Sequence, residues 1–163
     1  MRPTIDVREP RAGDVEELAI RLRPHDLAEL SSSSDASPES ILQAGIDGAR
    51  WAKAADVDGQ VAALFGVNPL AQEGAAHVGI PWLLCTPDIY SIGTLSFCRK
   101  AQFWYEEMHL EFDHLVNVVM ASNTKPIQWL HWLGFEFTSV YSRYGRHKVP
   151  FLQFESIRRL GDV

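Results

Sequence analysis

The sequence predicts a three-layer α/β fold, with a mixed central sheet of about seven strands and helices on both of its faces. Segments that alternate apolar and polar residues, as strands do, are interspersed with segments whose apolar residues recur three or four apart, as in helices. An Asp-Gly pair at residues 58–59 lies between two apolar runs and predicts a tight antiparallel hairpin. We expect residues 1–163 to form a single domain with one core.

The first forty residues predict a strand followed by helices. Residues 4–10 alternate apolar and polar side chains and end in a proline, which is typical of a half-buried strand. A helix should follow with Asp14 as its N-cap, and Pro24 should interrupt it before it resumes. The polar stretch SSSSDASPES predicts a loop, after which Ser37 or Ser40 can begin a second helix.

The middle of the chain predicts the centre of the sheet. Residues 51–67 contain the Asp-Gly hairpin. Residues 75–85 form a nearly continuous apolar run, which predicts a central strand, with a bulge or bend at residues 79–81 where a proline can be accommodated. Apolar residues three or four apart from Phe97 to Phe112 predict a helix, and residues 114–121 predict another buried strand.

The last part of the chain predicts a helix and a closing hairpin. In NTKPIQWLHWLGFEF, Asn123 can cap a helix, Pro126 fits its first turn, and Gly134 can end it. Residues 135–145 and 149–157 alternate aromatic and polar side chains and predict two paired strands.

Trp129 and Trp132 lie three residues apart in the predicted helix, and we expect them to share one face. Paired aromatic rings can line a ligand groove, but each also removes a large apolar area from water. We therefore expect the two rings to make contacts in the core or with a partner.

The charge and the apolar runs exclude two classes of protein. A formal net charge of -6 and a pI near 5.4 disfavour a general nucleic-acid binder, which needs a basic face. No apolar run reaches the roughly 18–20 residues of a membrane span, and no signal-type stretch follows Met1, so we expect a soluble protein.

Neither cysteine nor histidine spacing predicts a metal site. Cys85 and Cys98 are too few for a disulfide framework, and we expect both to be reduced and partly buried. The six histidines show neither the helical nor the short loop spacing of zinc ligands, so no metal is expected.

The order of elements resembles the GNAT fold of the acyl-CoA N-acyltransferases over nearly the whole chain. Asn123, Gly134 and Phe135 also match the family pattern N-x-x-A-x-x-x-Y-x-x-x-G-F. The resemblance implies a GNAT-like domain, an acyl-CoA cofactor such as acetyl-CoA, and transfer of an acyl group to an amine.

Residues 115–155 are similar, more narrowly, to the C-terminal part of a small internal virion protein of short-tailed phages. The residues that carry this likeness are Asn117, Val118, Asn123, Thr124, Ile127, Leu130, Gly134, Tyr141, Phe151 and Phe154. The likeness implies a phage protein with a role in the particle or its morphogenesis. Such a protein would be synthesised in the host cytoplasm, and whether it is then packaged inside the particle stays open. Its partners would be other virion proteins or a host protein.

The residues that should hold the cofactor depart from the family pattern. A pyrophosphate needs consecutive backbone N–H groups on small residues, which the family provides as Q/R-x-x-G-x-G/A before its main helix. Here that place has one glycine, Gly93, with Tyr90 at the position of the Gln or Arg. The candidates for acyl-CoA binding that the resemblance leaves are Cys85, Gly93, Thr94 and Asn123.

The general acid is also missing from its usual place. Leu130 occupies the position of the family tyrosine, and an apolar side chain cannot return a proton to a leaving thiolate. The catalytic candidates that remain are His77 as a base and Tyr141 as an acid, with Tyr90, Tyr144, Cys85 and Glu107 as further alternatives.

Three hypotheses follow. The first is a GNAT-fold virion or morphogenesis protein with a degenerate acyl-CoA site and little or no catalysis. The second is an active acetyl-CoA-dependent N-acetyltransferase with a divergent phosphate loop. The third is a factor that binds a host protein through an exposed aromatic patch.

Overall fold

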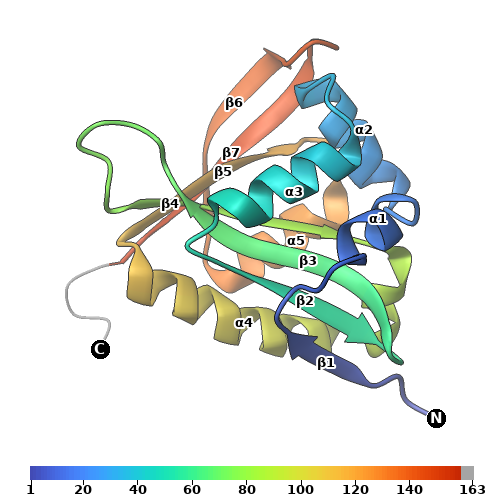
Figure 1. Ribbon diagram of the computed structural model, residues 1–163. Helices are drawn as coiled ribbons and strands as arrows, with labels where there is room; N and C mark the ends of the chain where they lie inside the picture. The colour runs from blue at the N-terminus through green and yellow to red at the C-terminus, as the bar shows by residue number, and fades with distance from the viewer. Residues whose placement is uncertain (159–163) are drawn as a thin grey trace.

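The computed structural model describes residues 1–158 and contains one seven-stranded sheet in the order β1-β2-β3-β4-β5-β7-β6 (Figure 1). The strands are β1 (Ile5–Arg8), β2 (Trp51–Val57), β3 (Gln60–Pro69), β4 (Val78–Cys85), β5 (His114–Met120), β6 (Glu136–Tyr144) and β7 (Val149–Ile157). Neighbouring strands are antiparallel except β4 and β5, which are parallel. The sheet is therefore mixed, as predicted, and β7 lies between β5 and β6.

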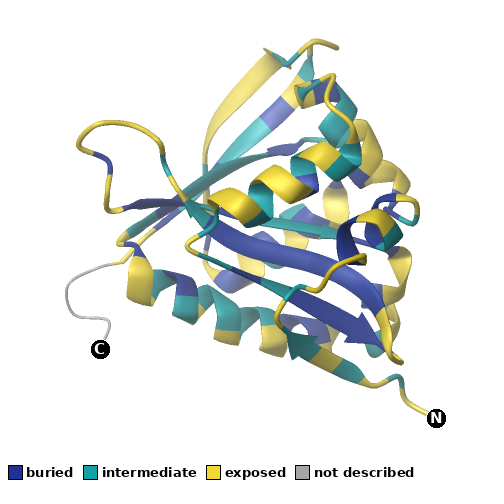
Figure 2. Ribbon diagram, in the orientation of Figure 1, coloured by how far each residue is buried: buried dark blue, intermediate teal, exposed yellow. Residues whose placement is uncertain are grey.

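Helices cover both faces of the sheet, which confirms the predicted three-layer class (Figure 1). α1 (Asp14–Ala19), α2 (Pro24–Ser33) and α3 (Pro38–Gly48) precede β2, and α1 and α3 pack on one face. α4 (Thr94–Glu111) and α5 (Thr124–Leu133) pack on the opposite face, and a short 3-10 helix, η1 (Pro87–Ile92), precedes α4. Buried residues lie mainly along the central strands and the helix faces turned toward them (Figure 2).

The predicted hairpin between β2 and β3 is confirmed. Asp58 and Gly59 both have positive φ angles, of 49° and 82°, which is the backbone that a two-residue turn between antiparallel strands requires. The predicted closing hairpin of β6 and β7 is also present.

Asp14 does not cap α1 as predicted. The N-cap is Gly13, and the Asp14 carboxylate instead accepts hydrogen bonds from the Arg8 guanidinium (2.8 and 3.0 Å) and the Arg11 N–H (2.6 Å). Arg8 also donates to both oxygens of Asp56, each at 2.8 Å. A bidentate arginine partner binds a carboxylate more strongly than the free amides of a helix end, so the side chain turns toward β1.

β4 and β5 pair only at their first residues and then diverge. The parallel register joins Val78 to His114 and Gly79 to Leu115 and goes no further. The predicted bulge at residues 79–81 is absent from the pairing of β4 with β3, which continues through these residues without a shift. Pro81 cannot donate a hydrogen bond toward β5, and the Asn117 side chain donates to its C=O at 2.8 Å where strand pairing has ended.

The two tryptophans of α5 do not share an environment. The Trp129 ring packs on Phe97, with 5.4 Å between ring centroids, whereas Trp132 is 52% exposed. Three residues on a helix turn the side chain by roughly 60° around the axis. That rotation carries Trp132 out of the narrow stripe that α5 buries. The predicted core contact is therefore confirmed for Trp129, and contact with a partner stays a prediction for Trp132.

Candidate functional site

The divergence of β4 and β5 opens a gap in the middle of the sheet, and a cavity of about 440 Å³ passes through it. Side chains from both helical layers line this cavity, among them Asp26 and Glu29 from α2 and Phe97 and Trp129 from α4 and α5. Most of the lining is apolar. Its volume is in the range of about 300–1,000 Å³ that small-molecule pockets occupy.

The edge of β4 that faces the gap carries peptide groups free of strand pairing. The Cys85 N–H donates to Asp26 and the Cys85 C=O accepts from the Arg23 N–H, so both groups point away from β3. In an antiparallel strand the N–H and C=O groups of successive residues point alternately to its two sides. The N–H and C=O of Leu83, two residues before Cys85, therefore also point away from β3. Leu83 therefore presents an N–H and a C=O to the gap beyond the point where β5 pairs with β4.

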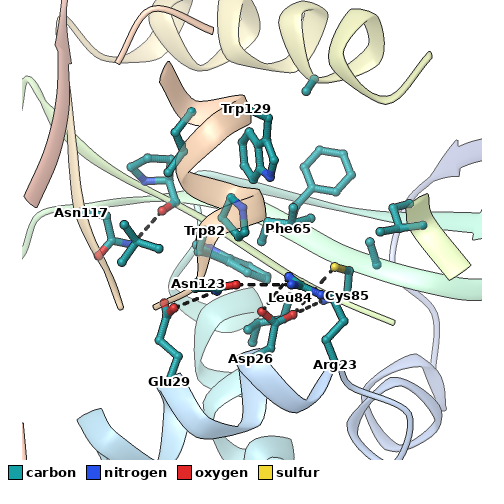
Figure 3. A pocket seen from close by; sticks show the side chains of 18 of the residues that line it. Arg23, Asp26, Glu29, Phe65, Trp82, Leu84, Cys85, Asn117, Asn123 and Trp129 are labelled. Carbon is teal, nitrogen blue, oxygen red and sulfur yellow. Dashed lines mark hydrogen bonds and ion pairs between the residues drawn. The ribbon is translucent and has the colours of Figure 1, made fainter. Parts of the chain in front are cut away.

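α2 closes the wide end of the gap on the β4 side (Figure 3). The buried Asp26 carboxylate accepts from the Cys85 N–H at 3.2 Å and lies 3.8 Å from the Cys85 Sγ. Arg23, three residues earlier, donates to the same carboxylate at 3.3 Å. The Arg23 guanidinium also lies over the Tyr90 ring, 5.1 Å from its centroid. Burial raises the pKa of Asp26, and it also raises the pKa of the Cys85 thiol to about 12. Cys85 is therefore a neutral thiol and a poor nucleophile.

α2 also reaches the end of β5 (Figure 3). Glu29 accepts from the Met120 N–H at 3.2 Å and from the Asn123 side-chain amide at 3.1 Å. The Asn123 Oδ1 in turn accepts from Arg23 at 3.3 Å. Asn123 is the N-cap residue of α5, but its side chain makes no capping bond, because it is 2% exposed and committed to this network. Burial raises the pKa of Glu29.

Two donors on the other side of the gap have no hydrogen-bond partner within residues 1–158. They are the Tyr90 hydroxyl and the Trp129 indole N–H, and both atoms are buried. Both rings pack against Phe97, at 5.5 and 5.4 Å between centroids. Burial raises the pKa of Tyr90, so its hydroxyl keeps its proton.

The segment between β4 and α4, where the family places its phosphate loop, forms the short helix η1. Two backbone N–H groups of this segment are used within it. The Ile89 N–H donates to the Thr86 C=O, and the Gly93 N–H donates to the Tyr90 C=O. Gly93 has a φ of 88°, and a Cβ placed there would meet nothing within 4 Å, so no close backbone approach depends on this glycine. The first-turn amides of α4 lie beside the 70% exposed Leu95.

Two of the four cofactor candidates line the cavity. Cys85 and Asn123 face it, and the structure brings them together through Arg23 and Asp26. Gly93 and Thr94 lie at the exposed start of α4 and do not line it. Their role in cofactor binding stays a prediction.

The two catalytic candidates lie away from the cavity. His77 is exposed at the end of β4 where the strands still pair, and its C=O accepts from the His114 N–H. Tyr141 is 40% exposed on β6, where its hydroxyl donates to Gln153 at 2.7 Å. Neither lines the cavity, and a catalytic role for either stays a prediction. Leu130, at the position of the family tyrosine, is 5% exposed in an apolar cluster.

Sequence reasoning missed Arg23 and two acids of α2. Arg23 is the N-cap that precedes the helix, and Asp26 and Glu29 lie three residues apart within it, which places them next to each other on its surface. This spacing was the available signal. No group of three or more His, Cys, Asp or Glu side chains in residues 1–158 is placed to hold a metal ion. No helix in the described part of the chain is long and apolar enough to cross a membrane.

Comparison with solved structures shows which fold this is. A protein assigned as an acetyltransferase from Salmonella typhimurium, solved with its cofactor acetyl-CoA, aligns with a TM-score of 0.72 and 12% identity, over 98% of this chain and 96% of that one. A ribosomal-protein-alanine N-acetyltransferase from Brucella melitensis aligns with a TM-score of 0.70 and 18% identity, over 93% and 98%. A GCN5-related N-acetyltransferase from Kribbella flavida gives 0.68 and 15%, over 94% and 97%. No family model and no curated protein matches the sequence. The chain therefore has the fold of the GNAT acetyltransferases.

Proposed function

We propose that the chain is a GNAT-fold virion or morphogenesis protein of a phage, with a degenerate acyl-CoA site and little or no acyl transfer. The observation that carries the loss of catalysis is the buried Leu130, because it takes the place from which the family tyrosine would donate a proton. The α2 network adds support, since Asp26 and Glu29 occupy the ends of both diverging strands. The phage role rests on the likeness of residues 115–155 to an internal virion protein.

Calorimetry with acetyl-CoA tests the degenerate site. We expect no heat of binding and no thermal shift at millimolar ligand, because Gly93 is the one glycine left where the family has its phosphate loop. Micromolar binding would contradict this part of the proposal. Circular dichroism on the same sample checks that the protein is folded.

Mass spectrometry of purified particles tests the phage role. The chain should be found in particles assembled from a genome that encodes it, at a constant ratio to the capsid protein after repeated gradient purification. Its presence only in the infected-cell lysate would contradict a place in the particle and would favour a role in assembly or binding to a host protein.

A second candidate is an acetyl-CoA-dependent N-acetyltransferase with a divergent phosphate loop. The free peptide groups of Leu83 favour it, because they could bind the amides of an extended cofactor arm in the gap. Tyr90, with its protonated and unpartnered hydroxyl, would be the proton donor. Release of free thiol from acetyl-CoA in the presence of amines would support this candidate, and the Tyr90→Phe variant should abolish that release.

A further inference from the structure

Two buried hydrogen-bond donors in an apolar cavity need an explanation. More than about 90% of buried polar groups in proteins have a partner, and each exception carries a free-energy cost. The Trp129 indole can only donate, and the Tyr90 hydroxyl accepts no hydrogen bond within residues 1–158. Both groups therefore lack an acceptor, and both belong to side chains that line the same cavity.

The two donors belong to side chains that pack on the same ring. The Tyr90 and Trp129 rings both contact Phe97, with 5.5 and 5.4 Å between ring centroids. A single oxygen with two lone pairs, such as a carbonyl oxygen, can accept from both.

The charges around the cavity select against an anion. Asp26 and Glu29 face it from α2, and Arg23 is the buried cation that partners Asp26. Lys100 of α4 also lines it but is exposed to solvent. Lys125 lies over the Tyr90 ring at 4.6 Å but is exposed to solvent. A carboxylate in the gap would lie near the Asp26 and Glu29 carboxyl groups, and the buried cation, Arg23, is already paired with Asp26, which is unfavourable at low dielectric.

The size of the cavity exceeds ordinary packing defects. Its volume of about 440 Å³ is larger than the roughly 150 Å³ of an engineered apolar cavity that binds benzene. A water molecule needs two to four polar partners. Tyr90 and Trp129 pack among the apolar side chains around Phe97, which offer a water molecule few further partners at these two donors. A mainly apolar molecule satisfies both the lining and the donors.

We infer that the cavity between β4 and β5 binds a neutral, mainly apolar small molecule whose single carbonyl oxygen accepts hydrogen bonds from Tyr90 and Trp129. This ligand has no nucleotide and needs no phosphate cradle. The inference is independent of acyl transfer, and it holds for a structural protein that retains the gap of its fold.

The test uses 2-nonanone as a neutral ketone probe and nonanoate as its anionic counterpart, each titrated into the full chain by calorimetry at neutral pH. The ketone should bind, and nonanoate should bind at least tenfold more weakly. Trp129→Phe and Tyr90→Phe each keep an aromatic ring and remove one donor, so each should weaken ketone binding about tenfold. The matched control, Trp132→Phe, changes an exposed tryptophan of the same helix and should leave the affinity unchanged.

Three results would overturn the inference: no ketone binding by the wild-type chain at millimolar probe, equal affinity in the two donor variants and the wild type, or tighter binding of nonanoate. Thermal melts of all variants identify one that fails to fold, and the wild-type titration decides the question in that event. Acetyl-CoA calorimetry is a separate measurement, so failure of the degenerate-site proposal and failure of this inference are distinguishable.

Discussion

Glu29 accepts a hydrogen bond from the backbone N–H of Met120, the last residue of β5, at 3.2 Å. In an ordinary parallel sheet that N–H would donate to the neighbouring strand, but β4 has already diverged. A carboxylate of α2 thus takes the place of the strand C=O that would accept this hydrogen bond. Asp26 of the same helix does the same for the Cys85 N–H at the end of β4. Four predictions follow from these and related contacts.

Glu29→Ala should lower the free energy of unfolding by about 2–3 kcal/mol, because it leaves the buried Met120 N–H and the Asn123 amide without an acceptor. Urea unfolding followed by fluorescence measures the change. Glu73→Ala, in the exposed loop before β4, is the control and should stay within about 0.5 kcal/mol of the wild type. Equal effects of the two substitutions would show that the α2 network adds no stability.

The raised pKa values of Asp26 and Glu29 predict a specific pH dependence. Burial raises both above their ordinary values of 3.8 and 4.5, so the folded state holds these protons more tightly than the unfolded state. Their contribution to stability is then complete below the ordinary pKa and is lost as the pH rises through the folded pKa. Glu29→Gln mimics the protonated acid, so its stability relative to the wild type should increase from about pH 4 to about pH 7. A flat or falling difference in unfolding free energy would contradict the raised pKa.

Leu130→Tyr should destabilise the protein by about 1–3 kcal/mol and create no acyl transfer, because it places a larger, polar-tipped ring where the buried Leu130 packs among apolar side chains. Leu130→Met conserves the volume and should cost less than about 1.5 kcal/mol. Thermal denaturation measures stability, and thiol release from acetyl-CoA measures transfer. Transfer by the tyrosine variant would show that the remainder of the catalytic site is intact.

Arg8→Ala should cost about 3 kcal/mol, because it leaves the Asp14 and Asp56 carboxylates without their shared cation. The double variant Arg8→Ala/Asp14→Asn should lose less stability than the sum of the two single variants, because Asp14→Asn removes one of the two carboxylates that Arg8→Ala leaves unpaired. Chemical denaturation of the three variants gives this comparison. Arg2→Ala, at an exposed position, is the control, and simple additivity in the double variant would count against the coupled network.

Local patterns were sufficient to predict most of the fold. The Asp58-Gly59 turn, the apolar run of β4 and the Gly134 helix end each depend on neighbouring residues, and the structure confirms all three. The site could not be predicted in this way, because Arg23 and Asn123 are 100 residues apart and meet only in the folded chain. The sequence around Asn123 fits a side chain that caps α5 and equally one that pairs with buried charged groups. The tertiary contacts with Arg23 and Glu29 decide between these two roles.

The placement of β7 between β5 and β6 also constrains how the protein can be made. β6 leaves the ribosome before β7, yet its only partner in the sheet is β7, so it must stay unpaired until the later strand has emerged. During that interval β5 has an open edge as well. A chaperone that shields strand edges would then find its substrate at this stage of synthesis.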